Sequence, residues 1–120
     1  MKFFRLLLLL FLALQTQSEQ LKNILFVGNS YLYYNNSVHN YVEPMLREHH
    51  GSEIETKLSA IGGSKLHHHN IDHLLNPKNL NLDQQIDLLI MQGGSTEVVS
   101  EKDQEKFIQT VQQYLSLIHI

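Results

Sequence analysis

Residues 23–30 read NILFVGNS, and this stretch decides the fold. The unbroken apolar run Ile24–Val27 is typical of a strand that is buried on both faces, as strands of parallel sheets are. Gly28, Asn29 and Ser30 follow it directly and have the composition of a turn. We therefore interpret the stretch as the first strand of a parallel sheet, ended by a turn.

Two further segments have strand character. Residues 53–61 (EIETKLSAI) alternate between polar and apolar side chains and stop at Gly62 and Gly63, which break a strand. Residues 86–91 (IDLLIM) form another apolar run, and it ends at residues 92–95 (QGGS). The sequence thus predicts three strands, each followed by a turn that contains glycine and serine.

Two segments with helical character lie between these strands. Apolar residues recur at helical spacing over residues 38–49, with Gly51 as a stop signal and with residues 35–37 as possible caps. Pro44 either kinks this helix or marks its first turn. Residues 64–75 predict a second, short helix.

A third helix is predicted over residues 100–115. Ser100 and Asp103 have the spacing of a capping box at its start. A stripe at helical spacing is expected to pack in the core, and it consists of Phe107, Ile108, Val111, Tyr114 and Leu115.

Alternating strands and helices define the expected fold class. The order predicts right-handed βαβ units and an α/β protein, a three-layer α/β/α sandwich with a parallel sheet. Ligands of such sheets bind beyond the carboxyl ends of the strands. The turns at residues 28–30, 62–64 and 93–95 are therefore expected to line one rim.

Composition excludes several classes of function. The 120 residues fit one domain, and nine Lys and Arg against twelve Asp and Glu leave no basic cluster, so we expect no nucleic-acid partner. The absence of cysteine excludes disulfides, a cysteine nucleophile and thiolate zinc sites. The glycine turns lack the spacing of a dinucleotide or phosphate-binding loop, so we expect no cofactor.

Residues 1–18 (MKFFRLLLLLFLALQTQS) are typical of a secretory signal peptide. Lys2 and Arg5 precede an apolar run at residues 6–14, which is about half the length that spans a bilayer. We therefore expect an exported protein, secreted or periplasmic, without a stable membrane anchor.

Three blocks of the chain resemble the SGNH hydrolase superfamily, also called the GDSL esterases and lipases. They are ILFVGNSY at residues 24–31, GGSKLHHH at residues 62–69 and IDLLIMQGGS at residues 86–95, and the first block resembles the subgroup that reads GNS. The resemblance covers most of residues 21–99. It implies a three-layer, flavodoxin-like α/β/α hydrolase that acts on acyl esters, often those of carbohydrates.

The resemblance also implies roles for individual residues. Ser30 corresponds to the nucleophile that forms an acyl-enzyme, and its own N–H belongs to the oxyanion hole. Gly62 or Gly63 would supply a second N–H donor. The third donor of the family is an asparagine, which this sequence lacks, and Gln92 or Ser95 is the possible replacement.

Substrate contacts are expected around the nucleophile. The resemblance places Asn29 beside the nucleophile, and the pattern GG-x-x-L-x-x-H places His69 near the rim. Tyr31, Tyr33 and Tyr34 follow the nucleophile and either stack on a sugar or pack against the protein.

The family's catalytic Asp-x-x-His block does not occur in this sequence. Residues 115–120 read LSLIHI, which is one translation of a transposon end used to prepare sequencing libraries. We expect residues 19–114 to be the N-terminal part of an SGNH-like domain that is truncated after the third strand and the following helix. As given, the chain would lack its catalytic base.

Two other functions remain open at this point. The first is a binding module without catalysis, in which the same rim holds a sugar or an anion through N–H groups. The second is a histidine-based metal site, since His69 and His73 could share one helix face, near His67, His68 and Asp72. We favour a solvated histidine cluster over a native metal site.

Overall fold

The computed structural model describes residues 21–51 and 53–118. The predicted signal peptide lies outside these residues. The elements in chain order are β1 (Asn23–Gly28), α2 (Ser30–Tyr33), α3 (Val38–His50), β2 (Glu55–Ala60), η1 (Leu66–His68), α4 (Ile71–Leu74), η2 (Pro77–Leu80), β3 (Leu88–Met91), η3 (Ser95–Val98) and α5 (Glu101–Ile118), where η marks a 3₁₀ helix.

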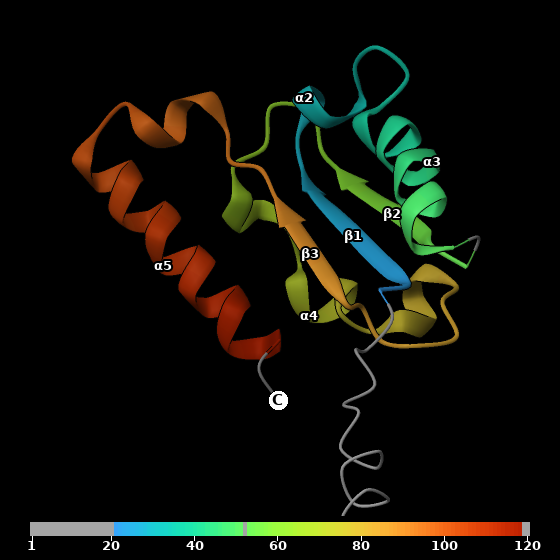
Figure 1. The fold of residues 1–120 in the computed structure, drawn as a ribbon. Helices are drawn as coiled ribbons and strands as arrows, with labels where there is room; N and C mark the ends of the chain where they lie inside the picture. Colours follow the sequence, from blue (N-terminus) through green and yellow to red (C-terminus); the bar gives the residue numbers. More distant parts are fainter. Residues whose placement is uncertain (1–20, 52, 119–120) are drawn as a thin grey trace, which may run out of the picture.

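The described strands form one parallel sheet in the order β2-β1-β3 (Figure 1). Phe26 in the central strand lies opposite Leu58 on one side and Ile90 on the other. This confirms the predicted parallel sheet, and the structure adds that the NILFV strand lies at its centre. The order also matches the start of the doubly wound order 2-1-3, in which the chain changes direction between β1 and β3.

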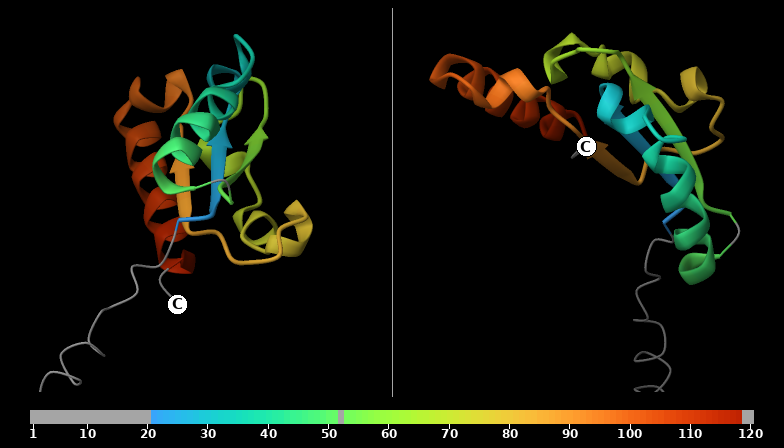
Figure 2. Two further views of the ribbon diagram at one scale, coloured as in Figure 1. Left: turned by 45° about the vertical axis from the view of Figure 1, so that its right-hand side comes forward. Right: turned by 90° about the horizontal axis from the view of Figure 1, so that it is seen from above.

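Side chains of β1 alternate between two apolar layers. Ile24 and Phe26 pack on the face that α3 covers, together with Val42 and Leu46 of that helix. The opposite face packs against η1, α4 and α5 through a separate cluster, whose buried members are Leu25, Val27, Leu66, Ile71, Leu74 and Tyr114. Figure 2 shows the sheet between these two layers. The predicted three-layer α/β/α arrangement is therefore confirmed.

The two long helices follow their sequence signals closely. α3 ends at Gly51, whose φ of 104° suits glycine and whose N–H donates to the Arg47 carbonyl at 3.0 Å. Pro44 lies inside α3 and does not end it. At the start of α5 the predicted capping box forms, because the Asp103 N–H donates to the Ser100 hydroxyl at 3.2 Å and that hydroxyl donates to the Asp103 carboxylate at 2.7 Å.

Several predicted boundaries and one predicted helix are wrong. β2 begins at Glu55 instead of residue 53, and β3 begins at Leu88 instead of residue 86. Residues 64–75 do not form one helix, because η1 ends at His68 and α4 begins only at Ile71. The helix is interrupted here because the His69 ring is hydrogen-bonded to the Gly28 carbonyl at the end of β1, and the local sequence pattern does not show this contact.

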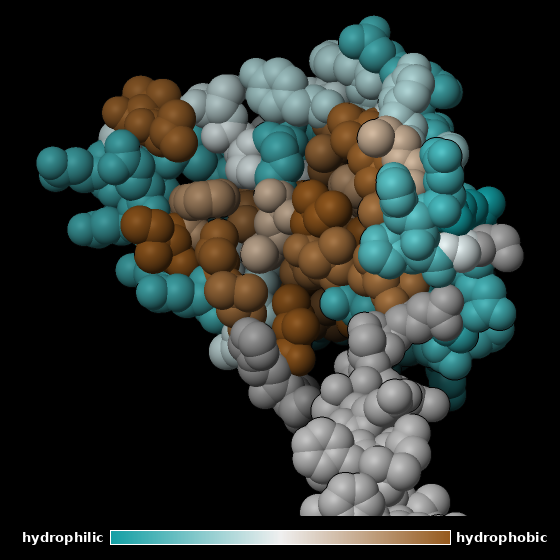
Figure 3. All heavy atoms as spheres, in the orientation of Figure 1, coloured by the Kyte–Doolittle hydropathy of each residue, from teal (hydrophilic) through white to brown (hydrophobic). Residues whose placement is uncertain are grey.

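Two apolar residues of α5 that were predicted to lie in the core are exposed. In the predicted core stripe, Tyr114 is buried and Phe107 and Val111 pack against the core, but Ile108 and Leu115 are exposed. Figure 3 shows apolar side chains gathered over the sheet and the neighbouring side of α5. Within residues 21–51 and 53–118, no helix combines the length and the apolar character needed to cross a membrane.

Candidate functional site at the carboxyl ends of the strands

The turns after the three strands meet at one edge of the sheet. The Ile61 N–H donates to the Gly28 carbonyl at 3.1 Å, which joins the turn after β2 to the end of β1. The turns after β2 and β3 also touch, since a Cβ added to Gly94 would lie 2.9 Å from the Ser64 carbonyl oxygen. The structure thus brings the three glycine- and serine-containing turns together into one rim.

Asn29 lies at the centre of this rim and is only 3% exposed. Its Nδ2 donates to the carbonyls of Ser64 at 3.1 Å and Gly93 at 3.3 Å, on the two neighbouring turns. Its Oδ1 accepts the Tyr31 N–H at 3.2 Å, and its own N–H donates to Gln92 Oε1 at 3.2 Å. The side chain that we expected to contact substrate is therefore fully engaged with the protein.

His69 is buried behind the same turn. Its Nε2 lies 2.8 Å from the Gly28 carbonyl, which can only accept, so this nitrogen carries the proton. Nδ1 then accepts from the Ser59 hydroxyl at 3.4 Å, and the Ser64 hydroxyl lies 3.3 Å from Nε2. Burial lowers the pKa of His69, although the hydrogen bond to Gly28 opposes the shift. Its predicted contact with substrate stays a prediction, and in this structure it braces the rim.

Ser30 is the first residue of α2 and is partly exposed. Its hydroxyl and its N–H have no hydrogen-bond partner among the described residues. Tyr31 is 60% exposed, and the Tyr33 hydroxyl lies over Gly62, at 2.9 Å from the position of an added Cβ. The rings of Tyr33 and Tyr34 meet edge to face, with centroids 5.4 Å apart. The three tyrosines therefore lie on the surface near the rim and do not pack in the core.

The other predicted oxyanion donors lie on the rim, and they differ in whether their polar groups already have hydrogen-bond partners. The N–H groups of Gly62 and Gly63 have no acceptor within residues 21–51 and 53–118, and Gly63 adopts a φ of 68° that favours glycine. The Gln92 carboxamide is engaged at both ends, since Oε1 accepts the Asn29 N–H and Nε2 contacts the Gly93 carbonyl. Ser95 begins η3 and is exposed.

Glu97 is part of the rim and was missed by the sequence interpretation. Its carboxylate is 2% exposed and accepts the N–H groups of Leu66, at 3.0 and 3.2 Å, and Gly94, at 2.5 Å. The bond from the Gly94 N–H to Glu97, three residues later, is the glutamate half of a capping box, and glycine has no side chain to form the other half. The Glu97 carboxylate thus links the segment after β2, through Leu66, to the turn after β3, through Gly94.

Tyr114 of α5 completes the support behind the rim. Its hydroxyl donates to the carbonyls of Leu66 at 2.8 Å and His69 at 3.0 Å. Burial raises the pKa of this hydroxyl, so it stays protonated and able to donate. The C-terminal helix is thus fastened to the segment that carries His69.

The histidines do not assemble into a metal site in the described part of the chain. His69 uses both ring nitrogens within the protein, whereas His73 lies on α4 with its Nδ1 3.2 Å from Asn79 Nδ2. The two residues were expected to share one helix face, and the break between η1 and α4 separates them. Residues 21–51 and 53–118 contain no group of three or more His, Cys, Asp or Glu side chains that could hold a metal ion.

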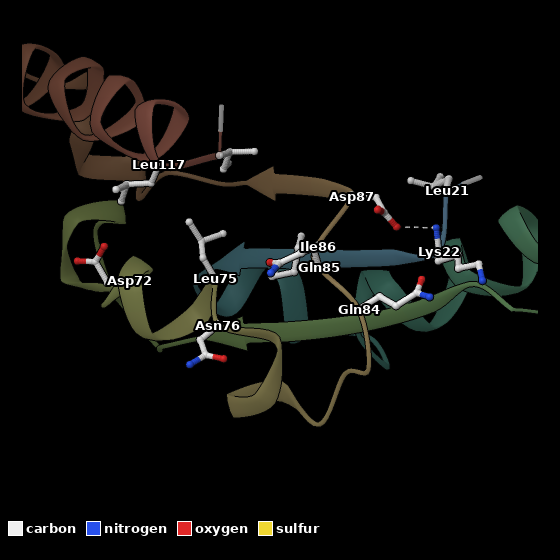
Figure 4. A pocket seen from close by; sticks show the side chains of 11 residues that line it. Leu21, Lys22, Asp72, Leu75, Asn76, Gln84, Gln85, Ile86, Asp87 and Leu117 are labelled. Carbon is white, nitrogen blue, oxygen red and sulfur yellow. Dashed lines mark hydrogen bonds between the residues drawn. The ribbon is translucent and has the colours of Figure 1, made fainter. Parts of the chain in front are cut away.

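A large hollow lies at the opposite end of the sheet (Figure 4). It has a volume of about 1130 Å³, and Leu75, Ile86 and Leu117 contribute apolar walls. Its best-placed carboxylate, Asp87, already accepts the N–H groups of Lys22 and Asn23, both at 2.8 Å. We place the candidate site at the carboxyl ends instead, because unpaired N–H groups and the unpaired Ser30 hydroxyl lie on the turns there and ligands of parallel sheets bind there.

The fold and the rim define an α/β protein with a candidate ligand site at the carboxyl edge of a parallel sheet. Comparison with models of known protein families, with curated proteins and with solved structures gives no match. Any function for this site therefore has to be argued from its geometry and from the sequence motifs that form it.

Proposed function

We propose that this chain is part of an exported serine ester hydrolase of the SGNH type, with Ser30 as its nucleophile. The observation that carries the proposal is the surroundings of Ser30. Its hydroxyl is unpaired and accessible, and unpaired N–H groups of Ser30, Gly62 and Gly63 lie on the same rim. This combination matches the roles that the GNS and GGS motifs imply.

The proposed chemistry is acyl transfer to the serine oxygen. Ser30 Oγ attacks the ester carbonyl, a base takes the hydroxyl proton, and the carbonyl electrons move onto the oxygen. Backbone N–H donors stabilise that oxyanion, each by about 3 kcal/mol. The alcohol leaves with a proton, and water then releases the acid from the acyl-enzyme. Small-molecule or carbohydrate esters are the proposed substrates.

The base for this reaction is not among the described histidines that surround the rim. His69 donates to the Gly28 carbonyl and has a lowered pKa, so it serves as a brace. The sequence also contains no Asp-x-x-His motif. Since a serine hydroxyl needs a base for rapid attack, we expect this chain by itself to react slowly.

Fluorophosphonate labelling followed by peptide mass spectrometry tests the proposal. We expect the label on Ser30 in preference to Ser95 and Ser100, which are exposed serines without the same N–H donors. Added imidazole should accelerate the labelling of Ser30 because it supplies a diffusible base. Ser30→Ala should remove the preferred site. Equal labelling of the three serines would rule out Ser30 as an activated nucleophile.

A binding module on the same rim is the second candidate. It is favoured by one observation, the absence of a base beside Ser30 among the described residues, while the N–H donors remain unpaired. Isothermal titration with acetate and with simple sugars separates the two functions. Saturable binding to a chain whose Ser30 is not labelled would favour the module.

A further inference from the structure

We infer that Asn29 is a positioning residue whose carboxamide fixes Ser30 where the three strand ends meet, and that an amide is obligatory at this position. The inference deepens the proposed function, because Ser30 is the group being positioned. The hydrogen bonds of Asn29 can be tested by NMR and by stability measurements, which need no enzymatic activity.

The first argument is the reach of Asn29 across the sheet. It follows the central strand, and its two Nδ2 protons go to opposite neighbours, the Ser64 carbonyl after β2 and the Gly93 carbonyl after β3. These partners lie 35 and 64 residues away in sequence. One side chain thus sets the separation of both flanking turns from the end of β1.

The second argument is the placement of Ser30 itself. Asn29 Oδ1 accepts the Tyr31 N–H, and the Asn29 carbonyl accepts the Leu32 N–H at 3.0 Å, so the residues after Ser30 are held in the first turn of α2. The Asn29 N–H is held by Gln92 at the same time. Ser30 lies between these fixed groups and keeps its own N–H and hydroxyl unpaired.

The third argument is chemical. Two carbonyl oxygens can be satisfied only by a donor with two protons, and at this length a carboxamide provides them. An ionised carboxylate would accept from Tyr31 but would oppose the Ser64 and Gly93 oxygens in a buried setting. Glutamine would add a methylene where Asn29 is 3% exposed. The GNS motif of this chain therefore has a physical reason for asparagine.

Asn29→Asp in the full chain tests the inference, with Asn35→Asp in the exposed turn after α2 as the matched control. The amides that share peptide groups with the two acceptors belong to Lys65 and Gly94. At pH 8 we expect their ¹⁵N resonances to move in Asn29→Asp and to stay in Asn35→Asp. The folding equilibrium constant should fall roughly tenfold or more in Asn29→Asp.

A pH titration separates this role from general loss of packing. Protonation of the introduced carboxyl returns one donor, so the Asn29→Asp chain should regain stability relative to wild type as the pH falls from 8 to 4.5. If the variant does not fold at pH 8, folding at pH 4.5 supports the inference. Asn29→Ser, which cannot reach both carbonyls, should show the Lys65 and Gly94 changes at every pH.

Fluorophosphonate labelling adds the functional readout. Asn29→Asp should lower the labelling rate of Ser30 about tenfold or more, with Ser95 and Ser100 unchanged. Unmoved Lys65 and Gly94 resonances together with wild-type labelling of Ser30 would overturn the inference. If the wild-type chain is not labelled, the hydrolase proposal fails, and the resonance shifts alone then decide whether Asn29 holds the rim.

Discussion

The two ends of the sheet are built on different principles. At the carboxyl ends, buried polar side chains of Asn29, His69 and Glu97 join the turns directly. At the amino ends, the chain leaves a hollow of about 1130 Å³ between partly buried apolar walls. Because the strands are parallel, one end of the sheet collects their carboxyl ends and the other their amino ends, and the side chains add to this difference.

The candidate site and the hollow therefore differ in their buried polar contacts as well as in volume. Buried polar groups must be satisfied, and a network that satisfies them holds its backbone in one arrangement. Such order is what a reacting serine needs, because its donors must stay in place while charge develops. The amino-end hollow is also lined by polar side chains, but its Asp87 carboxylate is already bonded to the N–H groups of Lys22 and Asn23.

Truncating a packed side chain at each end of the sheet should give the largest difference in the loss of unfolding free energy. Leu66 is fully buried, and Leu66→Ala should lower the free energy of unfolding by about 4 kcal/mol because a cavity is left in the core. Leu75→Ala, which enlarges the amino-end hollow, should cost about 1 kcal/mol. Urea denaturation measures both variants. Equal losses would contradict the proposed contrast.

Two carboxylates that each accept backbone N–H groups, one at either end of the sheet, allow a sharper comparison of the effect of burial. Glu97 and Asp87 each accept two backbone N–H groups, but Glu97 is buried and Asp87 is exposed. Glu97→Ala should cost roughly 3 kcal/mol because two buried N–H groups lose their acceptor. Asp87→Ala should cost under about 1 kcal/mol because water replaces the carboxylate. Similar losses in thermal melts would show that burial does not separate the two ends.

The attachment of α5 to the rim predicts a smaller effect. Tyr114→Phe removes the hydroxyl that donates to the Leu66 and His69 carbonyls, and should lower the free energy of unfolding by about 1.5 kcal/mol. Hydrogen exchange should show the loss first at the His69 N–H, which is bonded to the Leu66 carbonyl. Tyr41→Phe, on the exposed side of α3, is the control and should be neutral.

The smallest expected effect is the pH dependence of the free energy of unfolding that His69 causes. Burial lowers the pKa of His69 below its unfolded value, so the unfolded chain binds more protons and stability falls as the pH drops below about 6.5. The slope cannot exceed about 1.4 kcal/mol per pH unit for this one group. Burial also lowers the pKa of His67, which adds in the same direction.

His69→Gln isolates the contribution of His69 to this pH dependence. Glutamine can still donate to the Gly28 carbonyl but does not titrate, so the slope between pH 7 and pH 5 should become shallower. Urea denaturation at several pH values within this range measures it. An unchanged slope would mean that His69 does not titrate with folding.

Local signals in the sequence predicted the elements that depend on local physics. The apolar run at residues 24–27 identified a buried strand of the parallel sheet, and Ser100 with Asp103 identified the start of α5. Both depend on periodicity or on contacts between residues that are close in sequence. Glycines and polar residues at the three strand ends also located the rim, because parallel strands end at the same edge of a sheet.

Contacts over long sequence distances escaped the same analysis. The helix expected over residues 64–75 breaks because His69 is bonded to Gly28, 41 residues away. The burial of Asn29 and His69 was likewise not visible in the local pattern, and their contacts with substrate stay predictions. Glu97 was missed because its partners include Leu66, in another segment of the chain.

By itself, the sequence determined the α/β class, the parallel sheet with residues 23–28 in it, and the edge where the motif residues gather. These follow from hydrophobic periodicity and chain alternation, which act over a few residues. The tertiary structure alone decided which polar side chains hold that edge together. Hydrogen bonds such as those from Asn29 to Ser64 and Gly93 exist only after β2 and β3 have paired with β1.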